Sequence, residues 1–136
     1  MKEYVLDANA LVRLFRNQDG AAKIQELLIQ VDKKQVSLSI SAVNIAEVLY
    51  MYARYSTLDE ARKSIRKLQG LVKFMPPDIE QALAAAEIRF IYKLGFADCF
   101  AAELALRIGA TLVTADPDFV KLGKKLKILA LPRYKE

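Results

Sequence analysis

Four carboxylates stand out from the other acidic residues because of where they occur in the chain. Asp7 and Asp116 each follow a short apolar run. Glu47 is the only charged residue between positions 41 and 53, and Asp98 lies in an alanine-rich helical stretch. Most other acids are interspersed with lysine and arginine, as expected of solvated helix faces. The four therefore need a chemical explanation that the others do not.

A shared position connects these four acids. Asp7 and Asp116 come just past predicted strands, and we expect Glu47 and Asp98 in the first turns of helices. In a parallel sheet such positions fall on one edge, where ligands bind. Carboxylates clustered there repel each other by roughly 1–4 kcal/mol per close pair, so the cluster either takes up protons or binds a cation. Hard oxygen ligands favour Mg²⁺ or Mn²⁺ over zinc.

Each acid also has a purely structural interpretation. Asp7, Asp98 and Asp116 could cap the helices that follow them, and the proline after Asp116 strengthens that alternative. Glu47 could lie partly exposed at a helix edge. Asp118 could be a further ligand or a first-turn acid favoured by the helix dipole.

Composition narrows the chemistry. Histidine is absent and Cys99 is the only cysteine. This excludes Ser-His-Asp and Cys-His catalysis, zinc sites with histidine, and an intrachain disulfide. A reducing cytoplasm is the simplest setting.

The charge balance is basic. The net charge is +5, and the chain is more basic still once the four acids are set aside. A positive surface around an acidic, metal-filled pocket suits a nucleic-acid backbone. These features favour metal-dependent phosphodiester hydrolysis, while an ordinary lysine-rich surface is the alternative for the charge alone.

Length and hydropathy predict a single domain over residues 1–136. No apolar run is long enough to span a membrane, so we expect no membrane association. The N-terminal residues lead directly into the first predicted strand, so we also expect no signal peptide.

Strands alternate with helices or helix pairs along the chain, which predicts a parallel sheet covered on both faces. We expect the first strand where the strand order reverses. The predicted strands cover residues 4–6, 36–40, 71–75, 111–114 and 127–131. The predicted helices cover residues 8–16, 21–34, 42–55, 57–68, 78–94, 97–108 and 116–122.

Four short motifs resemble the acidic motifs of PIN-domain ribonucleases, and the most similar subgroup is the VapC-type toxins of prokaryotic toxin–antitoxin pairs. The resemblance covers essentially the whole chain, with the motifs in the family's order. The motifs are Asp7-Ala8-Asn9, Asn44-Ile45-Ala46-Glu47, Phe96-Ala97-Asp98-Cys99-Phe100-Ala101-Ala102 and Leu112-Val113-Thr114-Ala115-Asp116-Pro117-Asp118-Phe119.

The resemblance implies a three-layer α/β/α sandwich with a five-stranded, Rossmann-like parallel sheet. It implies that Asp7, Glu47, Asp98 and Asp116 form a catalytic quartet holding Mg²⁺ or Mn²⁺. Asp7 and Asp98 would be direct ligands, while Glu47 and Asp116 would act more through water. Three polar residues would have auxiliary roles: Asn9, Thr114 and Asp118.

The resemblance also implies endonucleolytic cleavage of RNA, homodimers, and inhibition by a small antitoxin protein. Two alternatives remain open. The chain could be an RNA- or protein-binding module that does not cleave. It could also be a Mg²⁺-dependent phosphatase, although such enzymes commonly carry a second aspartate where Asn9 stands here.

Two groups of residues are candidates for binding surfaces. Three neighbouring tyrosines could form a self-association or antitoxin surface, or could simply pack: Tyr50, Tyr52 and Tyr55. Five basic residues could line the RNA groove: Arg13, Arg16, Arg89, Lys93 and Lys121.

Overall fold

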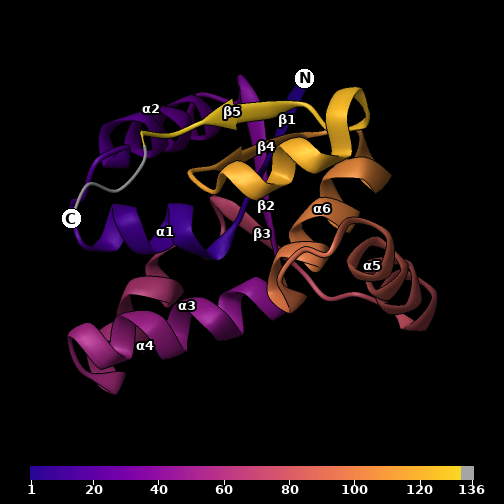
Figure 1. Cartoon of the computed structure of the whole chain (residues 1–136). Coiled ribbons are helices and arrows are strands. Elements are labelled where there is room, and N and C mark those ends of the chain that lie inside the picture. Colours follow the sequence, from indigo (N-terminus) through magenta and orange to yellow (C-terminus); the bar gives the residue numbers. More distant parts are fainter. Residues whose placement is uncertain (133–136) are drawn as a thin grey trace.

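The computed structural model describes residues 1–132, which form a five-stranded parallel sheet with helices on both faces (Figure 1). The strand order is β3-β2-β1-β4-β5. The strands are β1 (Lys2–Leu6), β2 (Val36–Ser41), β3 (Val72–Met75), β4 (Thr111–Thr114) and β5 (Ile128–Ala130). The helices are α1 (Ala8–Phe15), α2 (Ala21–Asp32), α3 (Ala42–Tyr55), α4 (Leu58–Lys67), α5 (Ile79–Tyr92), α6 (Phe96–Ile108) and the 3₁₀ helix η1 (Pro117–Lys125).

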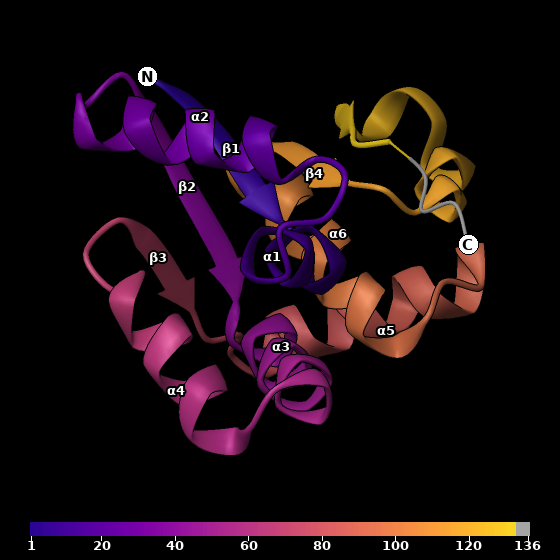
Figure 2. The same ribbon diagram turned by 90° about the vertical axis from the view of Figure 1, so that its left-hand side faces the viewer.

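Strand β1 lies at the centre of the sheet, with β2 on one side and β4 on the other. The chain first builds outward from β1 to β3 and then returns to add β4 and β5. The strand order therefore reverses between β1 and β4, as the sequence predicted. Figure 2 shows the arrowheads of β1 and β2 directed toward the region where α1, α3 and α6 lie.

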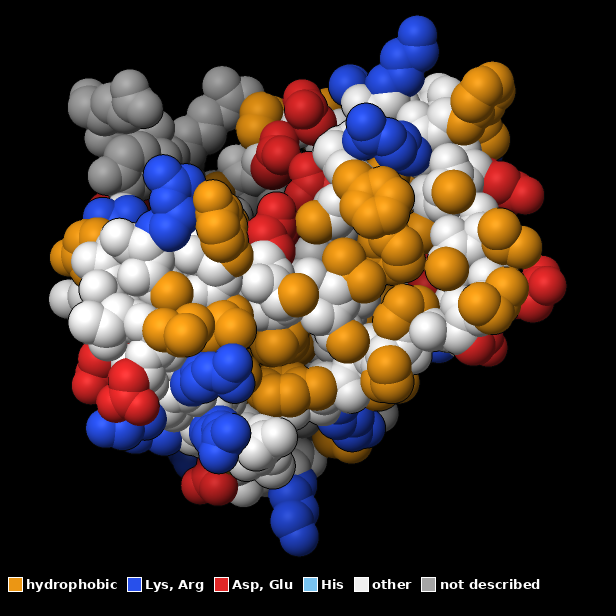
Figure 3. Space-filling model, turned by 90° about the horizontal axis from the view of Figure 1, so that it is seen from below, with side chains coloured by type: hydrophobic (Ala, Val, Ile, Leu, Met, Phe, Trp, Pro, Cys, Tyr) orange, Lys and Arg blue, Asp and Glu red, His pale blue; other side chains and the backbone are white. Residues whose placement is uncertain are grey.

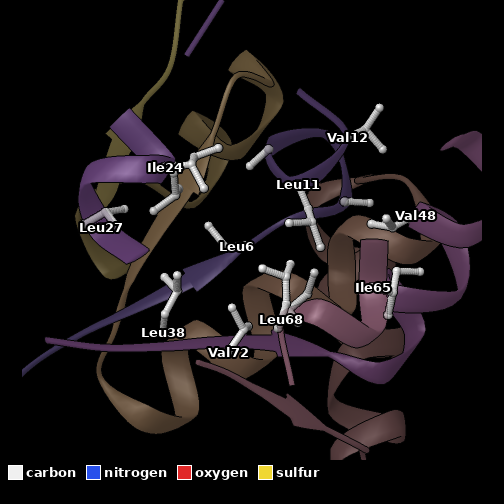
Figure 4. Close-up of a cluster of buried hydrophobic side chains, with 14 of the residues drawn as sticks. Leu6, Leu11, Val12, Ile24, Leu27, Leu38, Val48, Ile65, Leu68 and Val72 are labelled. Carbon is white, nitrogen blue, oxygen red and sulfur yellow. The ribbon is translucent and has the colours of Figure 1, made fainter. Parts of the chain in front are cut away.

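The two faces of the sheet pack against different helices because side chains alternate along each strand. Leu6 belongs to the core cluster formed with α1, α2, α3 and α4, which is drawn in Figure 4. Its neighbour Val5 belongs to the second cluster, which is formed largely by α6 and η1. The three-layer α/β/α arrangement is thus confirmed.

Several element ends differ from the predicted ones. The 3₁₀ helix η1 continues to Lys125, with a kink at Gly123, where φ is 60°. Glycine reaches this left-handed conformation without strain. None of the helices in residues 1–132 is long and apolar enough to cross a membrane.

Candidate metal centre

All four predicted acids line one cavity of about 480 Å³ at the carboxyl-terminal edge of the sheet. Figure 3 shows acidic side chains gathered in a hollow on this face of the molecule. The four acids come from segments far apart in the sequence. The cavity is lined by Asp7, Asn9, Arg13, Glu47, Met51, Asp98, Ala115, Asp116 and Pro117.

Asp7 is almost completely buried, with 2% of its surface exposed. Its Oδ1 accepts a hydrogen bond from the backbone N–H of Ala10 over 2.8 Å, which caps α1. Its Oδ2 accepts a hydrogen bond from the Thr114 hydroxyl. Both bonds fix the carboxylate, and each oxygen keeps a lone pair for a further partner.

Thr114 joins two of the acids. The same hydroxyl that donates to Asp7 accepts a hydrogen bond from the backbone N–H of Asp116 over 2.9 Å. Asp116 in turn caps η1, because its Oδ1 accepts from the N–H of Asp118 over 2.9 Å. The capping interpretation therefore holds for Asp7 and Asp116, and both still line the cavity.

Asp98 does not cap its helix, so that interpretation is wrong. Helix α6 begins after Gly95, and no side chain caps it. Asp98 lies in the first turn, as predicted. A Cβ atom at position 95 would lie 3.1 Å from its Oδ2, tighter than ordinary van der Waals contact. The absence of a side chain at Gly95 thus leaves room for this carboxylate.

Glu47 lies in the second turn of α3, which corrects the prediction of a first-turn position. Ser41 caps this helix, so one full turn separates the helix start from Glu47. The residue is half-buried, and burial raises the pKa of its carboxyl group, while the side chain of Asn44 partly offsets that rise. Glu47 is thus partly exposed, as the structural alternative expected, and it also lines the cavity.

Asn44 is a residue to which the sequence assigned no role. It is completely buried, and its Nδ2 donates to the carbonyl oxygen of Ala97 over 3.0 Å. The sequence did offer a sign of this role. Asn44 lies one turn before Glu47 on the same helix face, and a polar residue on a buried helix face needs a hydrogen-bond partner.

Burial, and to a smaller extent mutual repulsion, raises the pKa values of two of the carboxylates. Burial raises the pKa of Asp98 to about 7, with smaller contributions from the charges of Asp7, Asp116, Glu47 and Asp118. Burial also raises the pKa of Asp7 to about 6, against the opposing hydrogen bonds from Thr114 and Ala10. Nearby cationic charge would relieve this unfavourable concentration of negative charge.

The donor set fits a hard divalent cation, because the four acidic side chains offer only carboxylate oxygens. In residues 1–132, however, no three His, Cys, Asp or Glu side chains are already arranged as they would be around a metal ion. Holding one would require the side chains to converge from their present positions. The cavity between them provides space for that movement.

The auxiliary residues occupy different positions. Thr114 is buried between Asp7 and Asp116, and Asn9 is exposed and lines the cavity. Asp118 is exposed and does not line the cavity, although its charge contributes to the raised pKa of Asp98.

The candidate groove cations do not form one group. Arg13 lines the acidic cavity, and its Nη1 donates to the carbonyl oxygens of Asp19 and Pro132. Arg89 and Lys93 line a separate hollow. Two cations lie apart from both cavities: Arg16, which stacks over Tyr55 at 3.8 Å, and the exposed Lys121.

The tyrosines of α3 show partial packing. The Tyr52 ring lies 5.2 Å from the ring of Phe15 and 6.2 Å from that of Tyr55. Tyr50 and Tyr55 remain exposed, at 63% and 60%. Packing therefore explains Tyr52, while the other two present aromatic surface to solvent.

Solved structures share this fold at low sequence identity. VapBC2 from Rickettsia felis, solved with a DNA fragment from its promoter, matches with a TM-score of 0.74 and 18% identity over 95% of this chain and 98% of that one. DNA-bound VapBC from Salmonella typhimurium matches with a TM-score of 0.73 and 15% identity over 96% and 98%. The sarcin-ricin loop cleaving toxin VapC20 from Mycobacterium tuberculosis matches with a TM-score of 0.69 and 15% identity over 88% and 95%.

Sequence comparison defines the family. No functionally curated protein matches the sequence. The family model described as the PIN domain matches residues 4–125, which is most of the chain. The protein belongs to the PIN domain family.

Proposed function

We propose that this protein is a metal-dependent endoribonuclease and the toxin of a toxin–antitoxin pair. One observation carries the proposal: four carboxylates from distant segments line a single cavity that contains no histidine. Raised pKa values of Asp7 and Asp98 support it, because perturbed carboxylates in a cleft mark functional sites.

The chain's own residues would prepare the site. Asp7 and Asp98 would hold Mg²⁺ or Mn²⁺ directly, and Glu47 and Asp116 would act through water. The cation would supply an activated water and stabilise charge on the phosphate oxygens. Thr114 keeps the Asp7 carboxylate in one orientation, which preorganises the site before substrate arrives.

The partners follow from the same resemblance. One structural neighbour is a toxin–antitoxin complex from Klebsiella pneumoniae, and VapC20 is described as cleaving the sarcin-ricin loop. We extend both features to this chain as proposals: an RNA substrate and a small antitoxin protein. We also propose a homodimer and a cytoplasmic location.

Cleavage of a mixed structured RNA by the purified protein tests the activity. Reactions contain Mg²⁺, Mn²⁺ or EDTA, with Asp7→Asn and Asp98→Asn purified in parallel. We expect metal-dependent cleavage that both variants lose. Equal cleavage by all three proteins would indicate a contaminating nuclease.

Calorimetric titration of the wild type with Mn²⁺ separates an enzyme with a narrow substrate range from a module that only binds. Metal binding without cleavage would show that the acidic site binds the cation and that the tested RNA is not the substrate. Other RNAs would then be tested. Absence of metal binding would contradict the proposed mechanism and favour the binding module.

A further inference from the structure

A second, cationic hollow lies next to the acidic cavity. It has a volume of about 310 Å³ and is lined by Arg89, Lys93, Leu94 and Gly95. Both ionisable side chains in this lining are positively charged. The proposed catalytic cleft thus has a basic neighbour.

The hollow is held in place by hydrogen bonds to the short loop between α5 and α6. Arg89 Nη1 donates to the carbonyl oxygen of Leu94 over 2.8 Å. The Cys99 thiol donates to the carbonyl oxygen of Gly95 over 3.1 Å. Lys93 ends α5 in the left-handed conformation, with φ of 58°, which turns the chain toward α6. Both helices therefore fix the loop residues Leu94 and Gly95, which line the hollow beside the two cations.

Gly95 belongs to the boundary between the two cavities. It lines the cationic hollow, and a Cβ atom there would lie 3.1 Å from Asp98 Oδ2 in the acidic cavity. No side chain at this position separates the two. A polymer lying in the acidic cavity could therefore continue over Gly95 into the hollow.

The two cations remain available to an external anion. In residues 1–132 the ion pairs are Lys23–Glu26, Lys63–Asp59 and Arg107–Glu103, so neither Arg89 nor Lys93 is engaged in one. Arg89 uses one nitrogen for Leu94, and a guanidinium offers five donors in all. Lys93 is exposed.

We propose that Arg89 and Lys93 form a phosphate-binding subsite for single-stranded RNA that passes over Gly95 from the acidic cavity. This inference rests on the proposed nuclease function and extends it to the path of the substrate. Metal-bound carboxylates would engage the phosphate to be cut, and the cations would bind a phosphate further along the same strand. Such backbone contacts strengthen binding without reading sequence.

Binding of a short labelled single-stranded RNA, followed by fluorescence anisotropy in EDTA over a KCl series, tests the subsite without requiring catalysis. The test variant combines Arg89→Gln with Lys93→Asn, because asparagine tolerates the left-handed conformation of Lys93. We expect affinity to fall about tenfold and the salt slope to decrease by about 1.4, from two lost phosphate contacts on a single strand.

A matched control removes two positive charges at the opposite edge of the sheet. Lys33 and Lys127 are exposed and precede β2 and β5, so Lys33→Gln with Lys127→Gln should leave the salt slope unchanged. Arg89→Lys keeps the positive charge but loses the guanidinium that bonds to the carbonyl of Leu94. We expect this variant to keep the salt slope, because the subsite acts through its charge. Circular dichroism melting checks that each variant is folded.

The outcomes separate this inference from the nuclease function. An unchanged salt slope in the double variant, a loss equal to that of the control, or no RNA binding by the wild type would overturn the subsite. Cleavage by the wild type would still support the nuclease in any of these cases. Loss of slope in a protein that neither cleaves RNA nor binds Mn²⁺ would support the subsite and contradict the nuclease.

Discussion

Asn44 on α3 and Ala97 on α6 are joined by a hydrogen bond of 3.0 Å from the side-chain amide to the backbone carbonyl. Glu47 lies one turn after Asn44, and Asp98 directly follows Ala97. This bond therefore fixes the distance between the two helices that carry Glu47 and Asp98.

Replacing Asn44 with alanine should lower both stability and activity. The variant removes the buried hydrogen bond from Asn44 to the carbonyl of Ala97, which costs about 0.5–1.5 kcal/mol in the free energy of unfolding. We expect kcat to fall more than KM rises, because the acids lose their relative position. Urea unfolding and cleavage kinetics measure the two effects.

Ser37→Ala is the matched control for Asn44→Ala. Ser37 is also buried, yet its hydroxyl has no hydrogen-bond partner within residues 1–132. Its removal should change stability and kcat little. Equal effects of the two substitutions would show that Asn44 has no positioning role.

Thr114→Val removes the hydroxyl that connects Asp7 with the backbone of Asp116. We expect a loss of about 1–3 kcal/mol in unfolding free energy, because Asp7 Oδ2 and the N–H of Asp116 lose a buried partner. Cleavage should also weaken. Thr111→Val, on the same strand, is the control. Chemical denaturation of both variants shows whether the loss of stability comes from the bonds at the site or from any threonine-to-valine change on β4.

The stability of the metal-free protein should decrease as pH rises. The pKa values of about 6 for Asp7 and about 7 for Asp98 lie above those of an unfolded chain. Between about pH 4 and 7 the folded state thus binds more protons, so the free energy of unfolding falls with increasing pH. Thermal melts in EDTA measure this trend.

Asp98→Asn should flatten that pH dependence, because the amide does not titrate. A slope unchanged by the substitution would refute the assignment of the trend to Asp98. With Mg²⁺ present, protons compete with the metal for the carboxylates, so cleavage should increase over the same pH range.

Asp98→Asn should also separate metal binding from structure. In EDTA the variant should be as stable as the wild type or more stable, because repulsion is relieved. Mn²⁺ at a hundredfold excess over Kd should stabilise the wild type by about 2.7 kcal/mol and so raise its melting temperature. The melting temperature of the variant should not change. The surface substitution Asp32→Asn is the control, and an intact Mn²⁺ response in Asp98→Asn would remove Asp98 from the site.

Tyr50→Glu tests the exposed tyrosine surface as the homodimer contact. Tyr50 is 63% exposed, so the substitution should leave the melting temperature nearly unchanged. We expect the mass from light scattering to fall from dimer to monomer. Tyr52→Glu, which disrupts packing on Phe15, should instead lower the melting temperature, and an undisturbed dimer in Tyr50→Glu would place the contact elsewhere.

The fold could be predicted from the sequence because its signals are local. Apolar runs mark the strands, and capping residues such as Ser41 and Thr57 mark helix starts that the structure confirms. The place of the first strand, at the reversal of the strand order, followed from the general rule for parallel sheets. The second-turn position of Glu47 was also within reach, since Ser41 had already fixed the start of α3.

The internal bonding of the site could not be predicted in the same way. The bond from Thr114 to Asp7 joins residues 107 positions apart, and that from Asn44 to Ala97 spans 53. Such pairs depend on strand register and on the crossing of α3 with α6. Periodicity carries neither kind of information, so the sequence placed the acids on one edge without showing what orients them.

The central position of β1 has a consequence for the newly synthesised chain. Asp7 is synthesised 107 residues before its partner Thr114. Thr114 lies on β4, so β1 can pair with β4 only after that whole stretch has been made. A ribosome-bound fragment that ends before β4 lacks Asp116 altogether. The acidic cavity is therefore complete only after β4 and Asp116 have been made, and shorter fragments do not expose the cell that synthesises them to a complete site.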